Sequence, residues 1–132
     1  MKSFFSVILL IGFFLLSGCS DAKTQTLEMF FNDADIQTID KVILVDGSTG
    51  YSKTMTDSEQ IDEFIALIKD ILYTPQKNQE ERSGWRYGIK VVDGEKEFGF
   101  SLMQIGETYY DSEPDIHPIV DAYYQNLDIE EK

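Results

Sequence analysis

The sequence contains one cysteine, Cys19, and one histidine, His117, the two side chains best suited to chemistry near neutral pH. Nucleophilic catalysis needs a nucleophile with a base beside it. His117 precedes Pro118 near the start of an expected helix, where a lone histidine is more often a surface residue than a base. Adjacent acids such as Glu80 and Glu81 point apart in an extended chain, and no phosphate-binding glycine loop or metal-ligand spacing occurs in the sequence. We therefore expect a protein that is not an enzyme and that holds neither a metal nor a cofactor.

The residues before Cys19 have the organisation of an export signal. A short start with one positive charge, Lys2, precedes an almost wholly apolar run over residues 4–16. Because this run of 13 residues is shorter than the stretch of about 20 that spans a bilayer as a helix, it indicates a signal peptide. The alternative is an ordinary signal peptide with a stray thiol, or an uncleaved signal anchor.

The tetrapeptide Leu16-Ser17-Gly18-Cys19 resembles the lipobox of bacterial lipoproteins. The resemblance implies that the Cys19 thiol takes a diacylglycerol and that a peptidase cleaves just before it. It implies a signal peptide at residues 1–18, a lipidated tether at residues 19–32 and a lipid-anchored location at the cell membrane, facing the extracytoplasmic side. In Gram-negative lipoproteins an Asp after the cysteine resembles an inner-membrane retention signal. This chain has Ser20 there, and the sequence leaves the envelope type open.

The charge of the chain limits its partners. Cleavage before Cys19 removes Lys2 and no acid, so the formal charge changes from −13 to −14. This excess opposes nucleic-acid binding, since phosphate contacts need lysine and arginine. It favours cationic partners such as basic peptides, polyamines or divalent cations, although it also simply keeps an exported protein soluble. Residues 33–132 are expected to form a single domain, because a chain of this size buries roughly 65% of its unfolded surface without disulfides.

The mature chain has the pattern of a small α+β domain. Strands are expected over residues 41–45, 51–55, 85–92, 97–103 and 107–111, and helices over residues 56–74 and 116–127. Thr56-Asp57-Ser58-Glu59 predicts a capping box with Thr56 as the N-cap, and Asp115 can cap the last helix. The order β-β-α-β-β-β-α predicts a two-layer fold, with one antiparallel sheet of about five strands and two helices on one face.

The pair Asp93-Gly94 is a strong hairpin signal. A turn at these two residues pairs Lys90 with Glu97 and Gly88 with Gly99. Opposite charges then face each other, and apolar residues meet on the other face of the sheet. The two glycines leave bare backbone that another chain or a ligand can approach closely.

The face that carries the paired glycines is therefore expected to bind a partner. Its members are Arg86, Gly88, Gly99, Ser101, Met103 and Tyr110. The same parity places Trp85, Tyr87 and Tyr109 on the core face. The alternative is that the apolar segment of residues 27–31 folds back over the glycine face. Other interpretations place that segment at the domain edge or at the membrane interface.

Residues 74–84 form the longest stretch without a pattern, and their role stays open, because loops of this length are functional or merely variable. From Ile39 to Tyr110 the chain resembles small uncharacterised lipoprotein domains of Gram-positive bacteria, a resemblance that implies no known activity. The residues that carry it are Thr49-Gly50, Thr56-Asp57, the helix from Ile61, Gly84-Trp85-Arg86-Tyr87 and Tyr109.

Together these features predict a non-catalytic, lipid-anchored cell-surface lipoprotein that binds a protein or a peptide. One alternative is an immunity or sequestering lipoprotein for cationic peptides, which the acidic charge suggests. Another is an accessory lipoprotein with a structural role in the envelope. Capture of basic peptides should weaken strongly with ionic strength, whereas docking on an apolar patch should not.

Overall fold

The computed structural model describes residues 22–132. The predicted signal peptide, the lipobox and Cys19 lie outside the described residues. The elements follow the order β1 (Gln25–Thr26), α2 (Leu27–Asp33), β2 (Lys41–Asp46), β3 (Ser52–Met55), α3 (Ser58–Ile68), β4 (Leu72–Pro75), β5 (Tyr87–Asp93), β6 (Lys96–Ser101), β7 (Gln104–Ile105), β8 (Thr108–Glu113) and α4 (Ile116–Asn126). No helix of this part of the chain is both long enough and apolar enough to cross a membrane.

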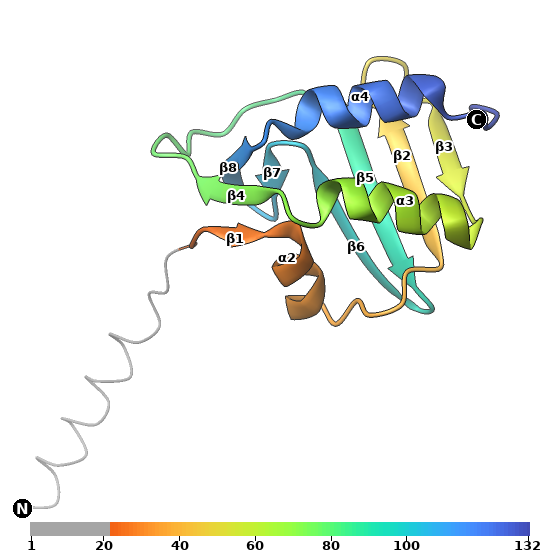
Figure 1. Cartoon of the computed structure of the whole chain (residues 1–132). Coiled ribbons are helices and arrows are strands. Elements are labelled where there is room, and N and C mark those ends of the chain that lie inside the picture. Colours follow the sequence, from red (N-terminus) through yellow and green to blue (C-terminus); the bar gives the residue numbers. More distant parts are fainter. Residues whose placement is uncertain (1–21) are drawn as a thin grey trace, which may run out of the picture.

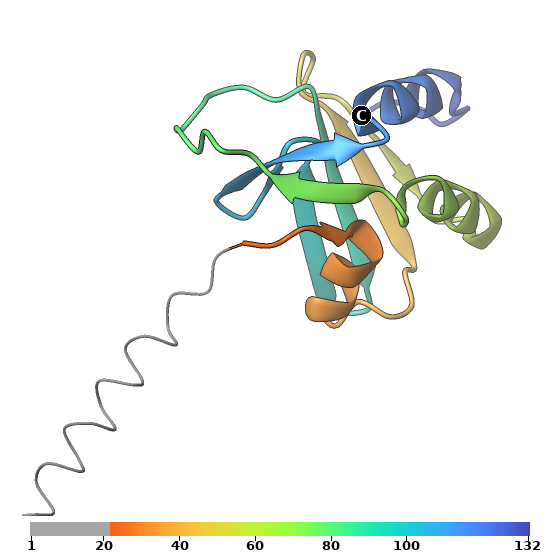
Figure 2. The same ribbon diagram turned by 60° about the vertical axis from the view of Figure 1, so that its left-hand side comes forward.

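The predicted two-layer α+β class is confirmed. The strands, however, form two sheets and not the single sheet of about five strands that was expected. Two antiparallel four-stranded sheets have the orders β3-β2-β5-β6 and β1-β4-β8-β7. Helices α3 and α4 lie side by side over one face of the first sheet (Figure 1). Strands β4 and β8 run across the direction of β2 and β5, and α2 packs beside them (Figure 2). The chain therefore builds its core between one helical layer and two sheets that differ in direction.

The end of the first long helix differs from the prediction. Helix α3 ends at Ile68, and the expected last turn is instead strand β4. Leu72 is 40% exposed while Tyr73 is fully buried. This alternation with a period of two residues is that of a β-strand. The N-cap is also one residue later than predicted. The Asp57 carboxylate, rather than Thr56, accepts hydrogen bonds from the first-turn amides.

The β5–β6 hairpin has a register two residues away from the prediction. Asp93 pairs with Lys96, so the turn lies one residue later than expected, and Gly88 faces Ser101 instead of Gly99. A slip of two residues keeps every side chain on its predicted face of the sheet, because the side-chain period is two. The glycines thus still share a face, but they are diagonal neighbours and not a direct pair.

The connection between α2 and β2 explains why Asp93 belongs to the strand and not to the turn. Its carboxylate accepts hydrogen bonds from the backbone amides of Gln37 at 2.8 Å and Thr38 at 3.0 Å. In return the amide of Gly94 donates to Asp40 at 2.8 Å. The two amides lower the pKa of Asp93. The hairpin end is therefore tied to a segment that is distant in sequence.

The apolar segment of residues 27–31 packs into the core edge. Leu27 and Phe31 are buried, and the Phe30 ring lies edge-on to Tyr110 with centroids 5.6 Å apart. Phe31 meets Phe98 on the core face of β6, at 5.9 Å between centroids. The alternative in which this segment covers the glycine face is wrong. The folded part begins at Gln25, within the stretch predicted as a tether and ahead of the expected domain start at residue 33.

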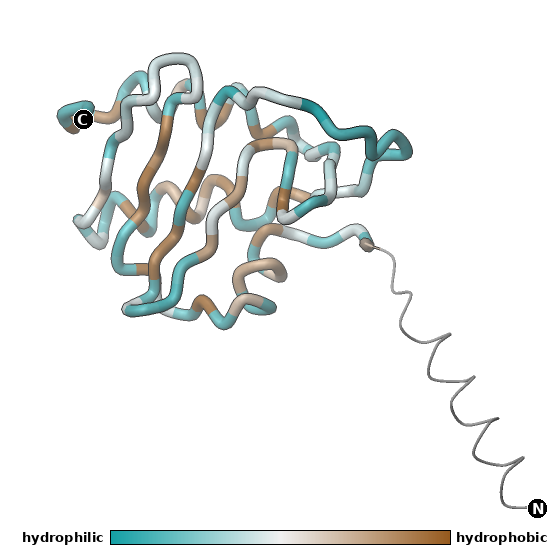
Figure 3. The backbone as a smooth tube through the Cα atoms, turned by 180° about the vertical axis from the view of Figure 1, so that it is seen from behind, coloured by the Kyte–Doolittle hydropathy of each residue, from teal (hydrophilic) through white to brown (hydrophobic). Residues whose placement is uncertain are grey.

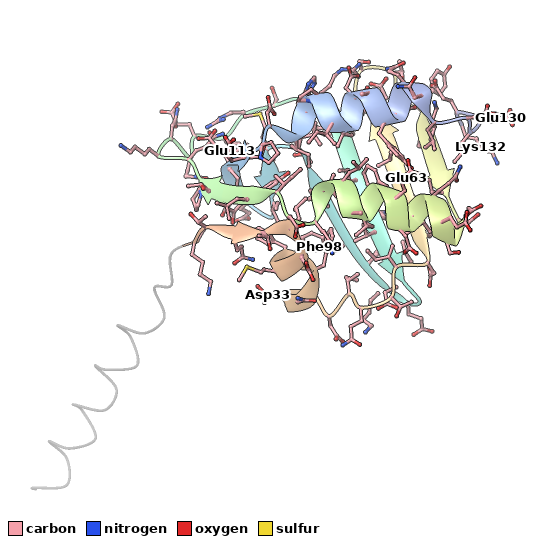
Figure 4. The ribbon with its side chains drawn as sticks, viewed as in Figure 1. Asp33, Glu63, Phe98, Glu113, Glu130 and Lys132 are labelled. Carbon is pink, nitrogen blue, oxygen red and sulfur yellow. The ribbon has the colours of Figure 1, made fainter. Side chains whose placement is uncertain are left out.

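A buried lysine closes the other end of the helical layer. Lys53 on β3 is only 7% exposed, and its Nζ donates to the carbonyl oxygens of Tyr124 at 2.7 Å and Leu127 at 2.9 Å. These carbonyls belong to the C-terminal end of α4, which carries partial negative charge. Beyond that end, Lys132 exchanges two backbone hydrogen bonds with Ser52, the first residue of β3 (Figure 4). The expected fraying tail is thus paired with a strand edge.

No helix of residues 22–132 covers the opposite face of the β3-β2-β5-β6 sheet (Figure 3). Ile43 and Val45 of β2 are partly exposed there, beside Gly88 of β5. This is the face on which the partner-binding residues were predicted.

Candidate ligand-binding cleft

A half-open cleft of about 560 Å³ lies between the β4–β5 loop, the β6–β7 connection and the start of α4. In Figure 1 the loop runs from the tip of β4 past the start of α4 to the start of β5. The volume falls in the range of ligand sites, about 300–1,000 Å³. The lining residues are Arg82, Gly84, Trp85, Arg86, Ser101, Leu102, Met103, Gln104, Tyr109, Tyr110, Asp111, Ser112, Asp115, Ile116 and His117.

Tyr109 holds the loop that forms one wall of this cleft. Its hydroxyl accepts a hydrogen bond from the Arg82 amide at 2.9 Å and lies 3.2 Å from the Arg82 carbonyl oxygen. The Arg82 guanidinium stacks on the Tyr109 ring, 4.4 Å from its centroid. The Gln79 side chain bonds both the amide and the carbonyl of Tyr109, at 2.8 and 2.9 Å. The patternless stretch of the sequence is therefore an ordered cleft wall.

Tyr110 has the opposite placement from the prediction, whereas Tyr109 is buried as expected but outside the main cluster of core residues. Tyr110 is buried in the core, with its ring centroid 5.8 Å from that of Tyr73, and Tyr109 lies beneath the loop. The prediction assumed that the alternation of inward and outward side chains in β6 continues without a break into β8. Leu102 and Met103 fall between strands β6 and β7, so the alternation is interrupted there. Tyr110 is consequently no outer-surface residue, although part of it borders the cleft.

Arg86 lines the cleft and takes part in a network of charges. Its guanidinium pairs with Asp46, reaches Asp121 at 3.7 Å and stacks on Tyr87, 4.5 Å from the ring centroid. The Tyr87 hydroxyl donates to Asp121 at 2.5 Å. This hydrogen bond, helped by the charge of Arg86, lowers the pKa of Asp121. Burial, helped by the same hydrogen bond, raises the pKa of Tyr87.

Asp46 ends β2 and is the buried member of this network. Burial by itself raises the pKa of its carboxyl. The Ser48 hydroxyl at 2.7 Å, the Ser48 amide at 2.9 Å and the Arg86 guanidinium together outweigh burial, so that the pKa of Asp46 lies below its usual 3.8. At neutral pH both carboxylates are therefore ionised and paired, and Tyr87 is neutral.

Trp85 was predicted on the core face, but it lies on the outer side of the sheet and is 51% exposed. Strand β5 begins only at Tyr87, so the strand alternation does not place the Trp85 side chain. The indole lies against two glycines. A Cβ on Gly88 would be 3.4 Å from Trp85 Cζ3, and a Cβ on Gly47 would be 2.8 Å from Cε3. The bare backbone expected to receive a partner is thus partly covered by the protein's own tryptophan.

The six predicted partner-binding residues are divided between two adjoining hollows. Arg86, Ser101, Met103 and Tyr110 line the cleft, whereas Gly88, Gly99 and again Ser101 line a shallower neighbour. Trp85 borders both. Sequence reasoning missed Arg82, Tyr109 and His117 as neighbours in this site. The usable signal was that both arginines of the chain occur within residues 82–86.

His117 borders the cleft with its ring centroid 6.2 Å from that of Tyr87. Within residues 22–132 its ring makes no hydrogen bond to a serine, a threonine or a carboxylate. In the same part of the chain, no three His, Cys, Asp or Glu side chains are grouped so that they could hold a metal ion. The arrangement offers the Arg82 guanidinium, the Asp111 and Asp115 carboxylates, aromatic rings and apolar surface to a ligand. Comparison with known proteins finds no matching family model, no matching curated protein and no matching solved structure.

Proposed function

We propose that this chain is a non-catalytic, lipid-anchored cell-surface domain that binds a peptide or protein segment in the cleft. The observation that carries the proposal is the pair Trp85 and Met103, each about half exposed where they border the cleft. Aromatic residues, methionine and arginine are enriched at the centres of protein interfaces. The cleft adds buried apolar surface from Leu102 and Ile116 beside them.

The polar groups of the cleft favour binding over catalysis. Arg86 is already engaged by the carboxylates of Asp46 and Asp121, and the described hydrogen bonds give His117 no nucleophile to activate. The groups that remain available are the unused donors of Arg82, one carboxylate oxygen each of Asp111 and Asp115, and aromatic faces. These fix the orientation of a ligand in a mostly apolar pocket.

A matched pair of methionine variants tests this function. Met103 is 52% exposed in the cleft, and Met29 is 51% exposed outside it. We expect Met103→Asp to abolish the cross-linking of a partner on intact cells, because it places a charge on the docking surface. Met29→Asp should leave cross-linking unchanged. Equal capture by both variants, with circular dichroism showing both folded, would refute a role for the cleft.

The anchor is tested separately. We expect the purified native protein to begin at Cys19 and to carry a diacylglycerol there, as measured by mass spectrometry. Cys19→Ala should abolish both cleavage and lipid attachment. An unmodified thiol on the native protein would refute the anchoring proposal and leave the cleft proposal standing.

A second candidate function is the capture of cationic peptides along the groove between α3 and α4. This groove has exposed Leu67 and partly exposed Tyr123 between Glu63 and Asp128. Glu63 lies between the two helices in Figure 4. Binding of oligolysine should then weaken with rising salt and fall in Glu63→Gln. Binding that is insensitive to salt would refute this candidate.

A further inference from the structure

We propose that the cleft recognises an acidic side chain of a peptide, flanked by apolar residues, through Arg82 and His117. This inference rests on the proposed function and adds the chemistry of the ligand. It runs against the overall charge of the protein, which by itself favours cations.

The cleft collects an unusual set of side chains for so acidic a chain. The sequence has two arginines and one histidine against 24 acidic residues. Arg82, Arg86 and His117 all line this one cleft. Arginine provides a planar fork of donors that matches a carboxylate, and the histidine adds a further donor. The rest of the acidic surface matters little to a bound group, since charges more than about 8 Å away are screened at physiological salt.

Arg82, Arg86 and His117 are not equally available to a ligand. Arg86 is already paired with Asp46 and held by it. Within the described residues, neither Arg82 nor His117 has a carboxylate oxygen within ion-pair distance. The Arg82 side chain spends one donor on the carbonyl oxygen of Asn78, at 2.7 Å, and is kept in place by stacking on Tyr109. Its remaining donors are fixed in position and free for a ligand.

Two acids also border the cleft, and each is partly engaged. Asp111 accepts a hydrogen bond from the Gln76 side chain at 3.2 Å, and Asp115 accepts one from the His117 amide at 3.1 Å. Each therefore has one oxygen free of these bonds. Arg82 keeps four of its five donors, and these belong to one planar group, whereas the free oxygens of Asp111 and Asp115 belong to two separate side chains. A ligand carboxylate therefore matches the planar fork of donors on Arg82.

The apolar walls set what stands beside the acidic group. Leu102 and Ile116 are buried beneath the cleft, and Met103 and Trp85 are half exposed at its border. A free carboxylate or phosphate would leave these surfaces uncovered. A peptide with apolar residues on either side of one acid would cover them while its carboxylate reaches Arg82.

The test uses three blocked tripeptides and the only tryptophan of the chain as the reporter. The detergent-solubilised full-length protein is titrated with acetyl-Leu-Glu-Phe-amide, acetyl-Leu-Gln-Phe-amide and acetyl-Leu-Lys-Phe-amide while Trp85 emission is recorded. We expect the Glu peptide to bind about tenfold more tightly than the Gln peptide, because a charge-assisted hydrogen bond is stronger than a neutral one. The Lys peptide should bind most weakly.

Variants separate charge from loop structure. Arg82→Gln and His117→Gln should each reduce the Glu-over-Gln preference severalfold, whereas Arg82→Lys should keep most of it. Lys77→Gln, in the same loop but outside the cleft lining, should leave the preference unchanged. Equal affinities for the three peptides would overturn the inference and leave the peptide-binding function intact. Preference for the Lys peptide, or no response of Trp85 to any peptide, would also overturn it, and the methionine variants would then decide separately whether the cleft binds a partner.

Discussion

Replacement of Lys53 by methionine should destabilise the fold. The Lys53 side chain is buried, and its ammonium donates to two carbonyl oxygens at the end of α4. It also lies 4.6 Å from the centroid of the Tyr124 ring. Lys53→Met keeps most of the apolar stem but removes the charge, both hydrogen bonds and the cation–π contact. The change therefore isolates the contribution of the ammonium group.

The size of the loss in the free energy of unfolding depends on the hydrogen bonds that the two carbonyl oxygens keep in the variant. Tyr124 O still accepts from the Leu127 amide at 3.3 Å, and Leu127 O still accepts from the Ile129 amide at 2.9 Å. No carbonyl is left without a partner, so the full penalty for a buried unsatisfied group does not arise. What remains is the attraction of a cation to a helix C-terminus in a buried geometry, up to about 2 kcal/mol. For a domain of this size, that corresponds to a lower Tm by about 8 °C.

The assay is urea unfolding followed by circular dichroism, with thermal melts in parallel. Lys41→Met is the matched control, because Lys41 is an exposed lysine on the neighbouring strand β2. The control should change the free energy of unfolding by less than about 0.5 kcal/mol. If Lys53→Met proves as stable as the wild type, the free energy gained by no longer burying a charge equals the free energy lost with the capping interaction. That result would refute the reasoning.

Three further predictions concern the cleft and its surroundings. Because the pKa of Asp46 is lower in the folded protein than its usual 3.8, its contribution to stability is complete above that value and is lost as the pH falls through the folded pKa. The stability difference between wild type and Asp46→Asn, measured in thermal melts across pH, should therefore be constant above about pH 5 and shrink below about pH 4. Gly47→Ala should destabilise the protein by more than about 1 kcal/mol and shift Trp85 emission, since the new Cβ would lie 2.0 Å from the Trp85 carbonyl oxygen. At Gly99 the nearest atom to a new Cβ is 3.9 Å away, so Gly99→Ala should change neither the stability nor the emission measurably. Tyr109→Phe should speed tryptic cleavage after Arg82 severalfold, because the loop loses its bond to the tyrosine hydroxyl; Tyr51→Phe, at an exposed tyrosine, is the control, and an unchanged cleavage rate would show that the stacked guanidinium holds the loop without the hydroxyl.

Much of the fold could be predicted from periodicity and caps. Helix α4 begins after Asp115 as expected, and Ile116, Val120 and Tyr124 form its buried stripe. Strand β4 was missed because Ile71 and Leu72 continue the apolar spacing of α3, and periodicity alone cannot separate a short strand from a last helical turn. The hairpin register was missed because a contact from residues 37–38 holds Asp93 in the strand. Local turn preference does not contain that contact.

The cleft itself could be predicted only in part. Arg86, Ser101 and Met103 were selected for a flat sheet face, and they border a cleft because the chain leaves strand geometry at residues 102–103. The opposite wall is built by a loop without any periodic pattern, and it is ordered through side-chain bonds to Tyr109. Such tertiary contacts over about thirty residues of separation are invisible to a reading based on neighbouring positions.

The position of β1 limits how far the protein can reach. Gln25 is fixed by its pairing with Tyr73, and it follows Cys19 by only six residues. Six residues, even fully stretched, cover about 20 Å. If Cys19 carries lipid as proposed, the folded domain stays close to the lipid headgroups. It would meet molecules that travel along or emerge from the membrane far more often than those that drift in the surrounding medium.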